Sequence, residues 1–240
     1  MEKQRLDKLI ASMGSFSRRE VKILIREGRI LADRVPVSSA EEKYDPETTE
    51  ISVDGVALGY RRYTYLMMNK PAGVLSATRD GKGKTVLDLL EPELRKLDLF
   101  PAGRLDKDSE GLLLLTNDGQ LAHRLLSPRH HVDKIYYVRT EGELTEEDCR
   151  AFAEGMTLGD GLQCLPAVLT ILRTGENSEA QVTLREGKFH QVKRMLSALG
   201  KPVLYLSRVQ MGNLTLDSAL APGEYRFLTE PEVKELHDVC

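Results

Sequence analysis

The first 59 residues alternate between apolar and polar positions in a pattern typical of two short helices followed by short strands. Apolar residues at i, i+3 and i+4, starting from Leu6, predict the first helix. A capping box over Ser17–Glu20 predicts the start of a second helix. Short strands are then predicted within residues 29–37 and 50–55, where the pattern alternates between turn residues. The N-terminal part is therefore predicted to be a small unit of two helices and a twisted sheet.

From Tyr65 onwards the pattern predicts a larger domain in which strands and helices follow one another irregularly. The apolar run Leu112–Leu115 is typical of a strand covered on both faces. Residues 190–199 carry apolar side chains at i, i+3, i+4 and i+7, which predicts an amphipathic helix. Because no regular βαβ repeat is present, we expect a mixed, largely antiparallel sheet flanked by helices. Further strands are predicted at 65–69, 135–138, 168–172 and 180–184, and further helices at 85–90, 120–126 and 145–155.

These patterns predict an α+β protein with domains at 1–59 and 65–240, joined by a linker at 60–64. Hydrophobic residues make up 41% and charged residues 30% of the chain, which is ordinary for a globular protein. No apolar run approaches the roughly 20 residues of a membrane helix, and Met1–Leu9 is unlike a secretory signal. The three cysteines are widely and irregularly spaced, unlike a disulfide framework or a zinc site. We therefore expect a cytoplasmic monomer without a membrane partner.

Basic residues are concentrated in the second predicted helix, although the net charge of the chain is −3. At 100° per residue, four of them fall within an arc of about 80°. Two interpretations fit this stripe: an RNA phosphate-binding surface, or a helix face exposed to water. The four residues are Arg18, Lys22, Arg26 and Arg29.

The most unusual segment, residues 103–119, is a charged loop that leads into the apolar run and then a turn. It contains three carboxylates within five residues, at Asp106, Asp108 and Glu110. The residues alone leave three interpretations open: a solvated loop, a metal site, or a pair of carboxylates for glycoside hydrolysis. The spacing does not continue as a calcium loop, and a chain with no Trp and only five Phe lacks the aromatic residues typical of a sugar cleft.

Segment 103–119, which begins Gly-Arg-Leu-Asp, resembles the signature segment of the ribosomal small-subunit pseudouridine synthase family. Three further segments resemble other motifs of this family and occur in the same order. They are Asn-Lys-Pro-Ala-Gly at 69–73, Lys-Ile-Tyr-Tyr-Val at 134–138 and Glu-Gly-Lys-Phe-His-Gln-Val-Lys-Arg-Met at 186–195. Residues 3–58 resemble the S4 RNA-binding module, except that Asp33-Arg34 stands where the module often has Asn-Gly.

The resemblance implies a role for individual residues. Asp106 matches the single essential aspartate of the family, and Lys193 matches the basic residue that pairs with it. Tyr136 matches the aromatic residue that stacks on the target uracil, while Arg104 matches a position that helps to open the RNA stack. The S4 resemblance favours phosphate binding by the basic stripe. Without the family, Tyr136 would be interpreted as a half-buried strand tyrosine and Lys193 as a solvated helix lysine.

The implied reaction needs few groups. Conversion of uridine to pseudouridine breaks the N1–C1′ bond and joins C5 to C1′, so no atom enters or leaves and we expect neither cofactor nor metal. A carboxylate either attacks C1′ or removes a sugar proton, and the sequence leaves both roles open. A nearby cation keeps that carboxylate ionised, and an aromatic ring receives the base that leaves the stack.

The expected substrate is small-subunit (16S) ribosomal RNA at the uridine-516 type site, either as RNA or within a ribosome assembly particle. Segments 127–131 and 190–194 look like the small-subunit versions of their motifs, whereas large-subunit relatives more often carry Asn-Arg at the Phe189-His190 positions. Two alternatives remain open: a large-subunit synthase, and a non-catalytic RNA-binding or ribosome-assembly protein.

Overall fold

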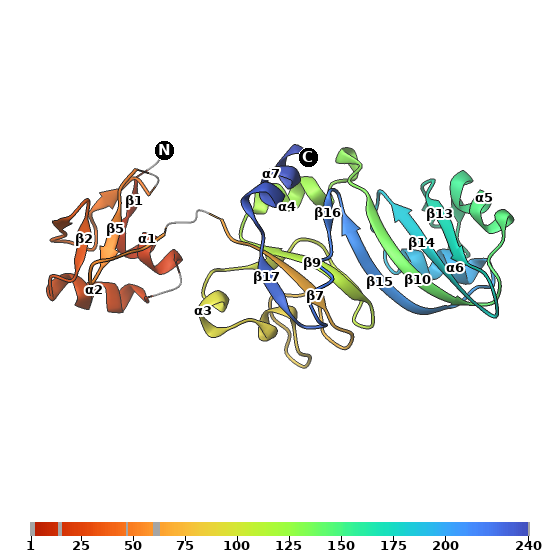
Figure 1. The fold of residues 1–240 in the computed structure, drawn as a ribbon, viewed down its shortest axis with the longest axis horizontal. Helices are drawn as coiled ribbons and strands as arrows, with labels where there is room; N and C mark the ends of the chain where they lie inside the picture. The colour runs from red at the N-terminus through yellow and green to blue at the C-terminus, as the bar shows by residue number, and fades with distance from the viewer. Residues whose placement is uncertain (1–2, 14–15, 47, 60–62, 240) are drawn as a thin grey trace. The chain divides into compact units, whose positions relative to one another are not determined.

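The computed structural model describes residues 3–13, 16–46, 48–59 and 63–239. The chain divides into two compact units (Figure 1). The first comprises Met1–Thr64 with Leu90–Leu99, and the second comprises Tyr65–Leu89 with Phe100–Cys240. Most of the predicted linker, residues 60–62, lies outside the described residues. No described helix is both long enough and apolar enough to cross a membrane.

The N-terminal unit contains the two predicted helices and the predicted small sheet. The capping box that begins the second helix is formed, because Ser17 N donates to the Glu20 carboxylate at 2.6 Å and Glu20 N donates to Ser17 Oγ at 3.3 Å. Leu9 and Val21 from the helices and Ile30 from the sheet are fully buried in one core. The elements are β1 (Gln4–Arg5), α1 (Leu6–Ser12), α2 (Arg18–Arg26), β2 (Ile30–Ala32), β3 (Val35–Pro36), β4 (Lys43–Tyr44), β5 (Ile51–Val53) and β6 (Val56–Ala57). The sheet order is β3-β2-β5-β6, and β1 pairs with β4.

The turn between β2 and β3 carries Asp33-Arg34, where the S4 module often has Asn-Gly. Both residues have positive φ, 49° and 67°, which is the geometry that favours Asn-Gly in a tight hairpin. Asp tolerates this region, and the Asp33 carboxylate accepts a hydrogen bond from Glu50 N at 2.9 Å. The hairpin is therefore retained with different residues.

The second unit is built on a sheet with the order β13-β14-β10-β15-β9-β7-β17, with β16 beside β15 and β8 beside β9 (Figure 1). All of its pairings are antiparallel except β15 with β9, so the predicted mixed, largely antiparallel sheet is confirmed. The strands are β7 (Tyr65–Lys70), β8 (Phe100–Pro101), β9 (Glu110–Thr116), β10 (Lys134–Glu141), β13 (Val168–Arg173), β14 (Asn177–Leu184), β15 (Val203–Met211), β16 (Leu214–Thr215) and β17 (Tyr225–Phe227). A separate pair is formed by β11 (Met156–Thr157) and β12 (Gln163–Cys164).

Helices pack along this sheet, with α6 against β15, α5 against β13 and α7 against β16. Helices α4 and α7 lie side by side, and Arg124 Nη2 is 3.0 Å from His237 Nδ1 (Figure 1). The predicted helix at 85–90 is a 3₁₀ turn, η1 (Val86–Leu89). The remaining helices are α3 (Pro92–Arg95), α4 (Gly119–Leu126), η2 (Pro128–His130), α5 (Glu146–Glu154), α6 (Gln191–Ala198) and α7 (Glu230–Asp238).

Candidate active site

The loop that carries Asp106 is fixed by its neighbours on both sides. Leu105 is buried, and Ser76 Oγ both accepts from Leu105 N (3.0 Å) and donates to Leu105 O (2.9 Å). On the other side, Ser109 N donates to Asp106 O at 3.1 Å and closes a turn over residues 106–109. The Asp106 side chain is 24% exposed, so its carboxylate can be reached from solvent but is held in place.

Hydrogen bonds from the segment 69–73 also hold this loop in place. Lys70 is fully buried, and its ammonium group donates to the carbonyl oxygens of Pro71 (3.0 Å), Lys107 (3.4 Å) and Ser109 (2.7 Å). Gly73 N donates to Lys107 O at 2.7 Å. Burial lowers the pKa of Lys70 to about 8, against the smaller opposing effect of the nearby carboxylates. The sequence motif was recognised, but this supporting role of Lys70 was not anticipated.

We predict that Lys70→Met lowers both stability and turnover. Three carbonyl oxygens lose their common donor, which costs at least about 1 kcal/mol of unfolding free energy. The displaced loop should reduce kcat by about tenfold or more. The pKa of Lys70 is about 8 when folded and 10.5 in its ordinary state, so the unfolded chain binds more protons between these values and stability rises with pH across this window. Urea unfolding from pH 7 to 10.5 should show that rise in the wild type only; equal profiles would contradict the assignment.

The strand after the loop starts with a close backbone contact. Gly111 has φ of 99°, and a Cβ added there would lie 2.3 Å from Arg208 O and 2.7 Å from Arg208 N. Only glycine allows β9 to approach β15 so closely at the point where the two strands pair in parallel. The motif glycine therefore fixes where the Asp106 loop joins the sheet.

Helix α6 brings a cation to the Asp106 carboxylate. Lys193 Nζ lies 3.1 Å from Asp106 Oδ2 and 2.6 Å from Asp108 Oδ1, and His190 Nε2 lies 3.4 Å from Asp106 Oδ1. Burial opposes the charged form of Lys193, but its hydrogen bonds to Asp108 and Asp106 outweigh burial and raise its pKa above the ordinary 10.5. The bond from Lys193 in turn lowers the pKa of Asp108. The ammonium is therefore charged at neutral pH.

Two of the three carboxylates of the loop share a partner, and the third has another. Asp106 and Asp108 contact Lys193, whereas Glu110 accepts a hydrogen bond from Tyr205 Oη at 2.8 Å. Among the residues that the structure describes, no group of three or more His, Cys, Asp or Glu side chains is placed to hold a metal ion. The contacts of Asp106 and Asp108 with Lys193 are those of an ion-paired loop.

A small cavity of about 60 Å³ lies over Asp106 and is also lined by Tyr136, Arg104 and Leu206. Two larger hollows, of about 390 and 460 Å³, share Arg104 and Lys188 with it, and the three together are called the groove below. Tyr136 is 9% exposed. The structure therefore brings together the four residues of this domain that the sequence singled out: Asp106, Lys193, Tyr136 and Arg104.

Tyr137 follows Tyr136 in β10, so the alternation of a strand directs its side chain to the opposite face, where it donates to Glu179 at 2.8 Å. Its partner lies on the neighbouring strand β14. Of the two adjacent tyrosines, only Tyr136 lines the groove.

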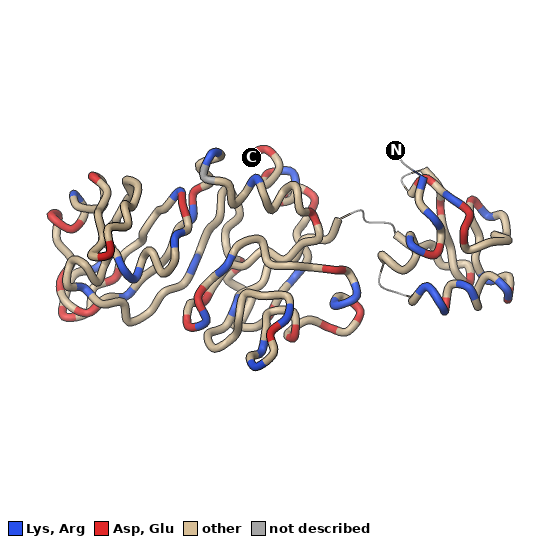
Figure 2. The backbone as a smooth tube through the Cα atoms, turned by 180° about the vertical axis from the view of Figure 1, so that it is seen from behind, with Lys and Arg blue, Asp and Glu red and all other residues tan. Residues whose placement is uncertain are grey.

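Two residues of the predicted basic stripe, Arg18 and Arg29, are paired with carboxylates of the N-terminal unit. Arg18 Nη2 pairs with the buried Asp7 at 2.8 Å. Arg29 lies beyond the end of α2, and its guanidinium pairs with Asp54 (2.6 Å) and Glu27 (3.0 Å). Figure 2 shows how acidic positions accompany the basic ones in this unit.

Lys22 and Arg26 are exposed on α2, and no ion pair is found for them among the described residues. These two are therefore the members of the stripe whose charge is most available to a ligand. Arg18 and Arg29 have internal partners that a phosphate would have to displace.

Comparison with known proteins identifies the family. Residues 64–198 match the RNA pseudouridylate synthase family, and residues 4–49 match the S4 domain. An uncharacterized RNA pseudouridine synthase of Bacillus subtilis is 50% identical over 98% of this chain and 98% of its own. The ribosomal small subunit pseudouridine synthase A of Escherichia coli is 42% identical over 95% of this chain and 98% of its own. That of Vibrio cholerae is 40% identical over 97% of this chain and 99% of its own.

A crystal structure of a pseudouridylate synthase agrees with this chain at a TM-score of 0.68, with 37% identity over 97% of this chain and 99% of that one. The chain belongs to the RNA pseudouridine synthase family, the class of isomerases that converts uridine to pseudouridine. The predicted order, an S4 domain followed by a pseudouridine synthase domain, is confirmed. The glycosidase interpretation is wrong.

Proposed function

We propose that this protein isomerises one uridine of small-subunit ribosomal RNA, at the uridine-516 type site, with Asp106 as its essential carboxylate. Two observations carry the catalytic part. Lys193 contacts the Asp106 carboxylate at 3.1 Å, and Asp106 lines the same cavity as Tyr136. The choice of RNA is supported by the two relatives named small subunit synthases, which match almost the whole chain. Because the proposed substrate is ribosomal RNA, the expected compartment is the cytoplasm.

Each group has a physical task in this reaction. The ammonium of Lys193 stabilises the ionised Asp106 carboxylate in a site from which the RNA excludes water. The ring of Tyr136 receives the uracil that leaves the stack, a step that costs a few kcal/mol. Arg104 is exposed at the rim shared by all three hollows, where it can occupy the space that the base vacates. The Asp106 oxygen then attacks C1′ or removes the sugar proton, and in either case the N1–C1′ bond breaks and the base turns and rejoins C1′ through C5.

The test is to map pseudouridine in ribosomal RNA from cells with and without this gene. Loss of one pseudouridine from small-subunit RNA, with restoration by the wild-type gene and not by an Asp106→Asn copy, is the expected result. A loss confined to large-subunit RNA would assign the protein to the neighbouring group. No change in either RNA would favour the non-catalytic alternative.

Tyr136 variants should separate stacking from other roles of the side chain. Tyr136→Leu should lower kcat/KM by about 5–150-fold, because base–aromatic stacking contributes about 1–3 kcal/mol. Tyr136→Phe keeps the ring and should preserve most RNA binding, with a smaller loss in turnover. Tritium release from RNA carrying 5-tritiated uridine measures both variants, and Tyr137→Phe is the control from the opposite face of the strand. Wild-type activity of Tyr136→Leu would show that the residue is structural.

The exposed pair on α2 should bind RNA phosphate. Lys22→Glu with Arg26→Glu should weaken RNA binding and reduce the slope of log K against log salt by about 1.5, since each phosphate contact contributes about 0.7–0.9. Filter binding at several salt concentrations measures this slope. Arg150→Glu with Lys234→Glu changes the charge equally at exposed positions of the other unit and should leave the slope nearly unchanged. Equal behaviour of the two double variants would show that the stripe is only a solvated face.

A further inference from the structure

Arg208 is a buried cation in the middle of the catalytic sheet. It lies on β15 and is 2% exposed, and its Nε donates to Leu112 O at 2.8 Å. Within the described part of the chain, no carboxylate forms an ion pair with it, and the buried Nη2 atom has no hydrogen-bond partner. Arginine remains charged in proteins, so this guanidinium cannot reduce its cost by losing a proton.

Arg208 forms part of the wall of the largest hollow of the groove, the one of about 460 Å³. Arg104, Lys134 and Lys188 also line this hollow, against a single carboxylate, Glu186. The hollow lies beside the cavity over Asp106, because Tyr136 lines both. A ligand group here would lie next to a base stacked on that ring.

The single carboxylate of the hollow is already engaged. Glu186 accepts from Lys188 Nζ (2.9 Å), Gln191 Nε2 (2.6 Å) and Leu165 N (2.8 Å). Lys188 also donates to Gln163 O, so its charge is directed at protein acceptors. The positive charge of Arg208 and Arg104 is therefore not balanced by Glu186.

A buried charge without a partner is costly, and a buried polar group without a hydrogen bond is rare in folded proteins. An anion in the hollow would supply both the missing charge and the missing acceptors. Phosphate fits this requirement, because its oxygens accept several hydrogen bonds from one guanidinium. The RNA strand that presents a uridine at Asp106 carries such a group on each side of that uridine.

We propose that this hollow binds a phosphodiester of the RNA strand next to the target uridine, with Arg208 as its buried ligand. The site would hold the strand while the base lies on Tyr136, and it would contribute to binding, with no part in the bond changes. The inference rests on pseudouridine synthase activity but not on which ribosomal RNA is the substrate, so any RNA that the wild type modifies can test it.

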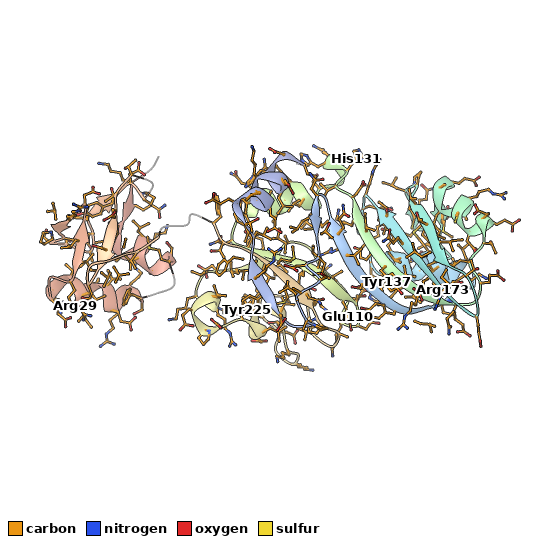
Figure 3. The ribbon with its side chains drawn as sticks, viewed as in Figure 1. Arg29, Glu110, His131, Tyr137, Arg173 and Tyr225 are labelled. Atoms are coloured by element: carbon orange, nitrogen blue, oxygen red, sulfur yellow. The ribbon has the colours of Figure 1, made fainter. Side chains whose placement is uncertain are left out.

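Arg208→Met tests this role, with Arg173→Met as the matched control. Arg173 is an exposed arginine on β13, the end strand of the sheet, and it pairs with Glu179 of β14 (Figure 3). Its loss therefore changes the net charge equally. We expect Arg208→Met to raise KM about tenfold or more with kcat within about twofold, and to reduce the salt slope by about 0.7. An unchanged KM and salt slope would overturn the proposal, as would a fall in kcat alone.

A second arm removes the charge from the ligand. In a short RNA substrate, each phosphodiester flanking the target uridine is replaced in turn by a methyl phosphonate. One replacement should weaken wild-type binding but cause little further loss in Arg208→Met, which identifies the contact by a double-mutant cycle. Should Arg208→Met fail to fold, Arg208→Lys serves as the partner variant.

Inorganic phosphate separates the possible sources of the anion. Thermal stabilisation of the wild type by inorganic phosphate, with no effect of any methyl phosphonate, would show a free-anion site and overturn the assignment to RNA. If the wild type modifies none of the RNAs tested, the proposed function is wrong. The methyl phosphonate binding measurements distinguish this outcome from failure of the phosphate site, because they need no turnover.

Discussion

Asp106→Asn should abolish pseudouridine formation while the protein remains folded and binds RNA nearly as well as the wild type. Asn retains the volume and much of the hydrogen bonding of Asp, but it removes the negative charge and the nucleophilic oxygen. Loss of a general base typically costs about 10²–10⁴ in rate, and loss of an attacking oxygen costs at least as much. The carboxylate closest in sequence, Asp108, is 76% exposed and is not among the residues that line the cavity over Asp106, so it is poorly placed to substitute.

Tritium release from 5-tritiated RNA measures this loss, and circular dichroism checks the fold. Asp108→Asn is the internal control, because it lies in the same loop and contacts the same lysine at 2.6 Å. It should retain substantial activity, and chelators should have no effect on either protein. Substantial turnover by folded Asp106→Asn would remove the basis of the proposed mechanism.

Local signals in the sequence were sufficient for much of the fold. The capping box at Ser17 correctly predicts the start of α2, and the run Leu112–Leu115 correctly predicts a strand buried on both faces. Strand alternation correctly separates Tyr136 from Tyr137. Each of these features depends on residues only a few positions apart, which is the range over which periodicity and capping act.

Features that depend on distant segments were not predicted. Strand β15 was missed because its sequence contains the polar residues Ser207 and Arg208, which are buried in the structure, where β10 and β9 pair with it on either side. The support of the Asp106 loop by Lys70 likewise joins segments 39 residues apart. Periodicity carries no information about such contacts, and a buried arginine or lysine contradicts the expectation that charged residues lie outside.

The candidate site was predicted from the family resemblance and not from spacing. Nothing in the local pattern places Lys193 beside Asp108, 85 positions earlier in the chain. The resemblance also gave no warning that Arg18 would pair with the buried Asp7. The basic stripe was projected on a helix, but Gly28 already ends that helix in the sequence and α2 ends at Arg26, so Arg29 lies outside it.

Lys193→Met should lower kcat strongly with little change in RNA affinity. Asp106 and Lys193 are 24% and 22% exposed, so solvent screens their contact only in part. Breaking a buried pair costs about 3–5 kcal/mol, and allowing for this exposure we expect about 2–3 kcal/mol, or about 30–160-fold in rate. Removal of the ammonium also leaves Asp106 next to Asp108 without the cation that both contact.

This second effect gives the prediction a specific signature. The double variant Lys193→Met with Asp108→Asn should be more active than Lys193→Met alone, because the repulsion between the two carboxylates is removed. Single-turnover rates at saturating enzyme isolate the chemical step from RNA binding. Lys234→Met, an exposed lysine on α7, controls for the loss of one charge and should match the wild type. If Lys193→Met reacts within about threefold of the wild type, below the expected loss, the 3.1 Å contact with Asp106 has no catalytic role.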